Sequence, residues 1–149
     1  MTNNLFDPPV SPGAVHPEDL RPFFRHAFCQ QTHRLHTFYT GFWTAPIARH
    51  VLQNFRTVLQ EASRGGRSFT LLDDCRTWPP QPQEVVEIAN KFVDICRDFP
   101  IARNAMVIPS ALVRMQVRRT VQDFDVCEIF ETFEEADQWL AEVETRAGL

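Results

Sequence analysis

The sequence contains no closely spaced pair of cysteines. Its four cysteines lie tens of residues apart and form no C-x-x-C motif (Cys29, Cys75, Cys96 and Cys127). This spacing excludes a zinc ribbon and a thioredoxin-type redox motif. The first 12 residues also lack the basic segment and the apolar run of a secretory signal. We therefore expect a cytoplasmic protein with reduced thiols.

An excess of positive charge and a long apolar run are also missing. The chain carries 15 basic and 19 acidic residues, which gives a formal net charge of −4. A nucleic-acid-binding protein usually shows the opposite sign or a strong basic stripe, so we expect no nucleic-acid partner. No stretch approaches the roughly 20 apolar residues that a membrane span needs.

The common catalytic signatures are absent as well. There is no Walker A motif, no G-x-G-x-x-G, no H-E-x-x-H and no kinase-type signature. His33 and His36 are an odd number of residues apart, so in an extended strand they would face opposite sides. Together with Cys29 they are better interpreted as surface residues of a sheet than as metal ligands. We expect no catalysis, no cofactor and no bound metal.

The features that are present describe one globular domain. The chain has 149 residues, of which 44% are hydrophobic, and this length is typical of a single domain. Residues 1–22 contain five of the eleven prolines and predict an irregular arm, with Phe6 and Val10 as its anchors. Residues 23–149 are expected to form the domain itself.

Hydrophobic periodicity predicts an α/β order within that domain. A hairpin is followed by alternating helices and strands, at 23–43 (hairpin), 45–62, 69–72, 84–99, 105–108, 110–121, 127–130 and from 132 onward. Thr44 and Ser110 are suited to cap helices, and Thr132 with Glu135 forms a capping box. Alternation of this kind predicts a single layered domain, with a mixed sheet, an N-terminal hairpin, parallel βαβ units and about four helices.

Four local sequences, taken in this order, resemble the SpoIIAA-like branch of the STAS (anti-sigma-factor-antagonist) domains. They are FYTGFWT, FTLLDD, AMVIPSALVRM and IFETFEEADQWL. The resemblance implies a SpoIIAA-like fold used for protein–protein regulation in bacteria. In the related SEC14/CRAL-TRIO-like branch it implies binding of an apolar ligand. Regulatory members place a phosphorylatable Ser or Thr in an Asp-Ser-x-Gly context, whereas the stretch 77–84 here has only Thr77 and no glycine.

Two acidic residues stand out as candidate site residues. Asp73 and Asp74 follow a short apolar run, and ligands favour the carboxyl ends of strands in α/β sheets. Adjacent carboxylates can hold a divalent cation or create one acid of raised pKa. In the simpler interpretation, one accepts backbone hydrogen bonds in a turn and the other faces water or an arginine. Ser110 is framed by no G-x-S-x-G motif, which favours a capping role.

A partner or ligand surface is expected around the same strand ends. Arg114 and Arg118 lie four residues apart on a predicted helix and would suit an anion or a docking protein. Trp78 sits in a proline-rich connector rather than in a regular element. The candidate surface residues are Asp73, Asp74, Arg76, Thr77, Trp78, Ser110, Arg114 and Arg118.

Three functional hypotheses remain open at this stage. The first is a cytoplasmic STAS-like regulatory or protein-interaction module without catalysis. Its protein partner is unknown, and one candidate is a second copy of the chain, paired through an edge strand. The second is a carrier of a small apolar ligand, which requires an enclosed cavity of at least about 300 Å³. The third is a hydrolase-like enzyme, which requires Asp73, Asp74 and Ser110 to converge in one cleft.

Overall fold

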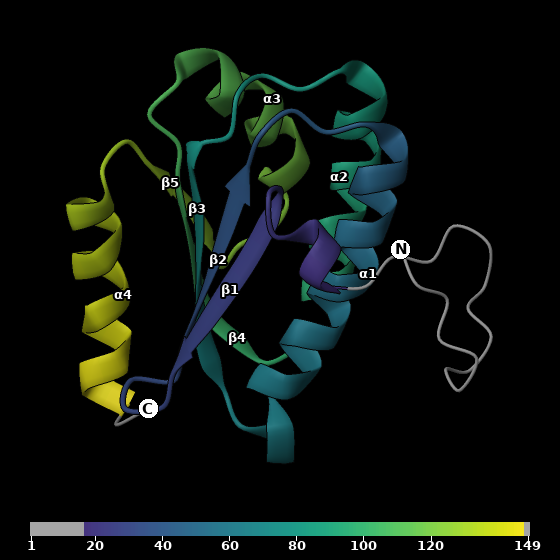
Figure 1. Cartoon of the computed structure of the whole chain (residues 1–149). Helices are drawn as coiled ribbons and strands as arrows, with labels where there is room; N and C mark the ends of the chain where they lie inside the picture. Colours follow the sequence, from purple (N-terminus) through teal and green to yellow (C-terminus); the bar gives the residue numbers. More distant parts are fainter. Residues whose placement is uncertain (1–16, 148–149) are drawn as a thin grey trace, which may run out of the picture.

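The chain forms one mixed β-sheet with helices on both faces (Figure 1). The computed structural model describes residues 17–147. Its elements are the short 3-10 helix η1 (Pro17–Leu20), β1 (Phe24–Cys29), β2 (Arg34–Thr40), α1 (Ala45–Ala62), the 3-10 turn η2 (Arg64–Gly66), β3 (Phe69–Thr77), α2 (Gln83–Cys96), β4 (Ile101–Val107), α3 (Ala111–Val121), β5 (Cys127–Phe130) and α4 (Phe133–Ala147). The predicted α/β fold, with its N-terminal hairpin and parallel βαβ units, is confirmed.

The strands follow one another across the sheet in chain order. β1 pairs antiparallel with β2, and the pairs β2–β3, β3–β4 and β4–β5 are all parallel. Because each crossover joins adjacent strands with the same hand, α1, α2 and α3 cover the same face of the sheet. The last helix, α4, returns across the opposite face (Figure 1). Within the described residues, no helix is long and apolar enough to cross a membrane.

Helix α1 forms where the sequence pattern predicted it. Its apolar side chains recur on one stripe and are buried, among them Val51, Phe55 and Leu59. The Thr44 hydroxyl accepts a hydrogen bond from the Ile47 N–H at 3.4 Å, which satisfies one of the free donors of the first turn. The predicted end of the helix at residue 62 is also confirmed, with Ser63 as its C-cap. Gly65 and Gly66 lie in the turn that follows, at φ values of 78° and 75°.

Several predicted boundaries are wrong by a few residues. β3 was expected to end at residue 72, but it continues to Thr77, and β4 begins at Ile101 rather than at residue 105. The helix expected at 84–99 spans Gln83–Cys96. The expectation for His33 is also wrong, because this residue lies in the hairpin turn at φ 56° and is buried.

Two apolar cores lie on the two faces of the sheet. The larger fills the space beneath α1, α2 and α3, and the smaller joins Leu72, Ala105 and Val107 to the α4 residues Ala136 and Leu140. Leu20 is only 3% exposed and belongs to the larger core, so the packed chain begins before the expected boundary at residue 23. The anchors proposed for the arm, Phe6 and Val10, lie outside the described residues.

Candidate functional site

Asp73 and Asp74 point to opposite faces of the sheet. Both lie inside β3, where successive side chains alternate between the two faces. Asp73 faces the helices α1–α3, and Asp74 faces the side on which α4 packs. Ser110 lies elsewhere, exposed at the start of α3, where its hydroxyl accepts a hydrogen bond from the Val113 N–H at 3.3 Å. The three side chains therefore do not converge in one cleft, and the expectation on which the hydrolase hypothesis depended is wrong.

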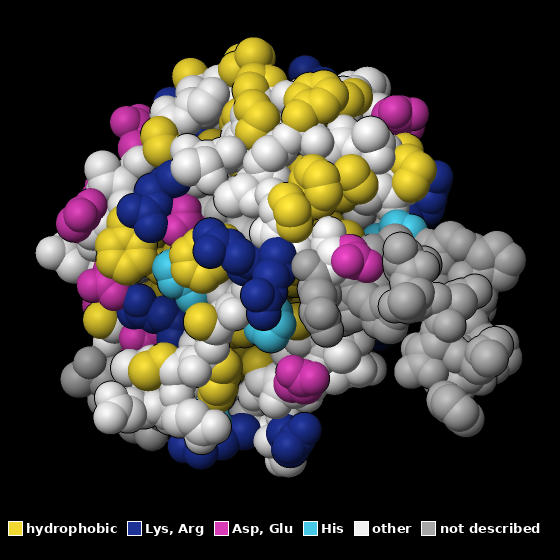
Figure 2. All heavy atoms as spheres, viewed as in Figure 1, with side chains coloured by type: hydrophobic (Ala, Val, Ile, Leu, Met, Phe, Trp, Pro, Cys, Tyr) yellow, Lys and Arg dark blue, Asp and Glu magenta, His cyan; other side chains and the backbone are white. Residues whose placement is uncertain are grey.

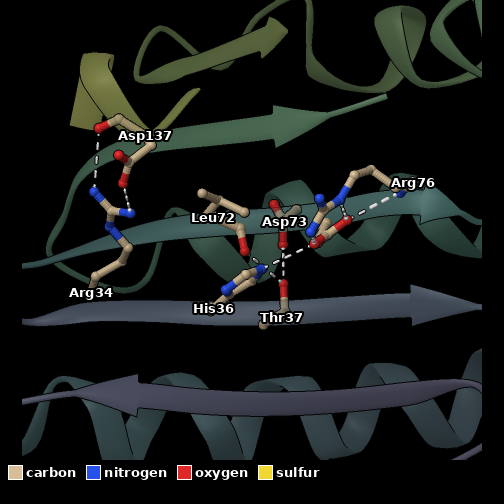
Figure 3. Close-up of polar contacts among 8 residues, drawn as sticks. Arg34, His36, Thr37, Leu72, Asp73, Arg76 and Asp137 are labelled. Atoms are coloured by element: carbon tan, nitrogen blue, oxygen red, sulfur yellow. Dashed lines mark hydrogen bonds and ion pairs between the residues drawn. The ribbon is translucent and has the colours of Figure 1, made fainter. Parts of the chain in front are cut away.

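Asp73 is the centre of a buried polar cluster. Its Oδ1 accepts hydrogen bonds from the Thr37 hydroxyl at 2.6 Å and the Tyr39 hydroxyl at 2.9 Å, and its Oδ2 accepts one from the Asn104 amide at 2.8 Å. Figure 3 shows the bond to Thr37 crossing between β2 and β3. Burial raises the pKa of Asp73, although these three donors act in the opposite direction. The cluster ties β2, β3 and β4 together beneath the helices.

Asp74 is held by an arginine and a histidine on the other face. The Arg76 guanidinium donates to it at 2.6 and 2.9 Å, and the His36 ring nitrogen Nε2 lies 3.2 Å from Oδ2 (Figure 3). Although burial acts in the opposite direction, these contacts with His36 and Arg76 hold the pKa of Asp74 far below its ordinary value. Arg76 also lies over the Phe133 ring, with 5.2 Å between its guanidinium carbon and the ring centroid. Asp74 therefore holds the side chains of Arg76 and His36 in place.

Because of these contacts, the free energy of unfolding should depend on pH. A carboxyl whose pKa is lowered by folding stabilises the protein above its unfolded pKa, here near 3.8, and loses that contribution as the pH falls toward the folded value. We expect Asp74→Asn to be less stable than the native protein at neutral pH, with the difference shrinking below about pH 4. Urea unfolding at several pH values measures this. The exposed control Asp123→Asn should show a small difference that does not change with pH, and a constant difference for Asp74→Asn would contradict the assignment.

An exposed apolar surface lies at the carboxyl end of the strands. The large hydrophobic side chains that are exposed in the described residues are Phe42, Leu112 and Met115, at 61%, 55% and 64%. Phe42 follows β2, and the other two lie in the first half of α3. Figure 2 shows hydrophobic side chains gathered at the top of the molecule, the end toward which β2 points in Figure 1. We call Phe42, Leu112 and Met115 the strand-end surface.

Gln81 connects the loops that carry this surface. Its side-chain amide donates to the Gly41 carbonyl at 3.1 Å, and its Oε1 accepts from the Trp43 N–H at 2.9 Å. Its backbone forms two further bonds with the Gln116 side chain of α3, at 3.2 and 3.0 Å. The β2–α1 loop, the proline-rich connector and α3 are therefore held in one arrangement, because a single buried glutamine bonds to all three.

The structure divides the surface residues proposed from sequence into two groups. Arg76, Thr77, Ser110 and Arg118 are exposed, whereas Asp73, Asp74 and Trp78 are buried, so the expectation that these three form an outer surface is wrong. Trp78 instead packs against Trp43, with ring centroids 5.1 Å apart.

Arg114 is occupied by contacts within the chain. Its guanidinium donates to the carbonyls of Ile108 and Pro109 at 3.0 and 2.8 Å and lies 3.6 Å from the Glu131 carboxylate. It therefore holds the loop before α3 in place, and it is less free than Arg118 to bind an anion.

Sequence reasoning missed the strand-end surface itself. A signal for part of it was present, because Val113 and Val117 form the inner stripe of α3 and Leu112 and Met115 fall outside that stripe. No comparable signal marked Phe42, which lies beside the fully buried Trp43.

A small cavity lies beneath the helices. About 60 Å³ is open between the sheet, α2 and α3, well below the 300 Å³ that the carrier hypothesis required. A wider groove of about 680 Å³ lies between the hairpin and α4, but it is open and is lined by charged residues, including Arg34, Asp137 and Glu144. In the part of the chain that the structure describes, no group of three or more His, Cys, Asp or Glu residues is placed to hold a metal ion.

Comparison with known proteins assigns no family to this arrangement. No protein-family model matches the chain, and no curated protein matches its sequence.

Proposed function

We propose that the protein is a cytoplasmic, STAS-like regulatory module that binds a partner protein through the strand-end surface and performs no catalysis. The observation that carries this proposal is the exposure of Phe42, Leu112 and Met115 at one end of a domain whose other described large apolar side chains are buried or half-buried. Apolar side chains gathered in this way are typical of protein interaction sites.

The composition of the surface supports a protein partner. Phenylalanine, methionine and arginine are enriched where proteins bind one another, and the exposed Arg118 and Arg119 follow Leu112 and Met115 along α3. An apolar centre flanked by cationic residues would suit a partner whose own apolar patch is flanked by acidic side chains. The four local sequences that resemble STAS domains favour the same class of function.

The rigidity of the surface is a second source of support. Gln81 fixes the loop of Phe42 relative to α3 before any partner arrives. A preorganised surface loses little conformational freedom on binding, so more of the contact energy remains as affinity. Phe42 and Met115 are thus suited to act as anchors.

Substitution of the anchors tests the proposal. We expect Phe42→Ser and Met115→Glu each to lower the amount of partner captured from the protein's own cells at least tenfold, because truncating an interface anchor costs about 2 kcal/mol or more. Quantitative mass spectrometry of the captured proteins measures this. The control is Gln53→Glu, which adds one negative charge to the exposed side of α1 and should change nothing.

Two results would contradict the proposal. One is capture that is equal for the native protein, both surface variants and the control. The other is reduced capture by variants that are also unfolded. Each exposed substitution is expected to change the free energy of unfolding by only about 0.5 kcal/mol, so the variants should remain folded. Light scattering on the same samples tests whether the partner is a second copy of the chain. In that case the native protein would be a dimer and Met115→Glu a monomer.

A further inference from the structure

The small cavity beneath the helices has an unusual lining. Six aromatic side chains surround it, contributed by β2, the β2–α1 loop, α1, the connector, α2 and the segment after α3 (Tyr39, Trp43, Phe55, Trp78, Phe92 and Phe124). Their rings are not stacked face to face. Trp43 and Trp78 meet at 65°, and Tyr39 meets Phe92 at the same angle. The aromatic rings therefore approach the cavity from several directions.

The described part of the lining includes one carboxyl group, that of Asp73, and no basic side chain. Asp73 lies on the cavity wall, and the described residues that line it include no Arg, Lys or His. The three side chains bonded to Asp73 are all neutral donors, from Thr37, Tyr39 and Asn104. Among the described residues, no ion pair includes Asp73, in contrast to Asp74 on the other face. A carboxylate has about four acceptor positions and these three donors fill three of them, so one position of Asp73 remains for a ligand in the cavity. A buried carboxylate without a counter-charge favours a cation there.

We propose that this cavity binds a small organic cation of the methylated ammonium type. Aromatic rings attract such cations through the negative potential of their faces, and the Asp73 carboxylate supplies the opposite charge. The open volume of about 60 Å³ is several times the roughly 10–15 Å³ that a single water needs, so the cavity can hold a small group larger than water, of the trimethylammonium or tetramethylammonium class. A metal ion is a poorer match, since it requires several oxygen, nitrogen or sulfur ligands in place of aromatic rings.

Partly exposed lining residues on α2, on α3 and after α3 indicate where a ligand would enter. They include Phe92, Thr120 and Phe124. A hydrogen bond of 2.5 Å from the Thr120 hydroxyl to the Asn90 side-chain oxygen joins the two helices there. Because this bond is exposed, it can break without leaving a buried polar group, and separation of the two helices would then admit the ligand. The site is distinct from the strand-end surface and does not depend on the proposed partner.

The charge of Asp73 makes binding sensitive to acid. Burial raises the pKa of Asp73, so it loses its charge at a higher pH than an exposed carboxyl does. The other titratable groups that its charge affects are Tyr39 on β2, Cys75 on β3, Cys96 on α2 and Cys127 on β5, and His36 lies behind it on the opposite face. Burial raises the pKa of the three thiols and of the phenol, so these four groups stay neutral while Asp73 titrates.

Titration with tetramethylammonium chloride tests the site. Tert-butanol is the matched neutral probe because it has a similar size and no charge, and sodium chloride controls for ionic strength. With tetramethylammonium we expect saturable changes in the tryptophan fluorescence and in the amide NMR signals of the lining residues. Tert-butanol should bind at least tenfold more weakly, and sodium chloride should have no effect. Asp73→Asn should weaken tetramethylammonium binding at least tenfold, whereas Asp123→Asn, which removes one exposed charge, should leave it unchanged.

Three results would overturn the proposal. They are the absence of saturable binding, equal affinity for the neutral probe, and unchanged affinity in a folded Asp73→Asn protein. If Asp73→Asn does not fold, the native protein supplies the readout, because binding must weaken as the pH is lowered and Asp73 takes up a proton. Binding that is constant with pH would then contradict the role of the carboxylate. None of these outcomes bears on partner capture, which depends on the exposed side chains of Phe42, Leu112 and Met115, and none of these three lines the cavity.

Discussion

Replacing Arg34 with alanine should destabilise the protein by about 3–5 kcal/mol, because it leaves a buried carboxylate without its partner. Arg34 donates two hydrogen bonds of 2.8 Å to Glu144 and one of 2.6 Å to Asp137, both on α4. Figure 3 shows Arg34 of β2 and Asp137 of α4 facing each other. The Glu144 side chain is only 4% exposed and also accepts from the Thr70 hydroxyl. Urea unfolding at neutral pH measures the change.

Two comparisons separate this effect from a general loss of charge. Arg56→Ala removes an exposed pair with Asp98, in which the side chains are 45% and 60% exposed, and should cost at most about 1 kcal/mol. A double variant with methionine at positions 34 and 144 should recover most of the stability, because it removes both buried charges together. A loss for Arg34→Ala no larger than that for Arg56→Ala would mean that α4 is not held by this ion pair.

Replacing Trp43 with alanine should cost about 3–5 kcal/mol through the cavity that it leaves in the core. Trp43 is 1% exposed, packs against Tyr39 and Trp78, and donates a hydrogen bond from Nε1 to the Thr40 carbonyl at 2.9 Å. Its backbone N–H also bonds to Gln81, so the substitution should loosen the loop that carries Phe42. Chemical denaturation gives the stability, and partner capture gives the effect on binding.

The neighbouring residue supplies a matched control. Phe42→Ala removes an aromatic ring one position away, but this ring is 61% exposed, so stability should change by only about 0.5 kcal/mol while capture still falls. Trp43→Phe keeps an aromatic ring in the core and should lie between the native protein and Trp43→Ala. Equal destabilisation by Phe42→Ala and Trp43→Ala would contradict the division of this loop into a buried and an exposed residue.

The elements that the sequence predicted best are those specified by their own residues. The stripe of α1 and its Thr44 cap are local features, and the helix was placed at its observed bounds. Alternation of strands with helices was enough to predict parallel pairing and right-handed crossovers, and the sheet follows that order. Ser110 was assigned correctly as a cap because no base or glycine motif accompanied it.

The misplaced strand ends have a different cause. β3 and β4 continue through Asp73 and Asn104, polar residues that interrupt an apolar run and suggest a turn when they are read alone. They remain in strands because each bonds to the other across the sheet, and Asp73 also bonds to Thr37 and Tyr39. Partners more than 30 positions away satisfy these groups. A local pattern contains no information about them.

The same limit applies to the candidate site. Trp78 of the connector was expected at the surface, yet it is buried. Gln81, for which the sequence suggested no role, is buried as well and organises the loops around it. Only the packing of the connector against α3 reveals which side chains remain outside.

A photo-crosslinking amino acid placed at position 115 tests the proposed function most directly. With p-benzoylphenylalanine in place of Met115, irradiation of the protein's own cells should produce one discrete heavier species that contains this chain and its partner. The same amino acid in place of the exposed Arg49 on α1 should give no such species. Crosslinks at position 49 but none at position 115 would show that the strand-end surface is not where the partner binds.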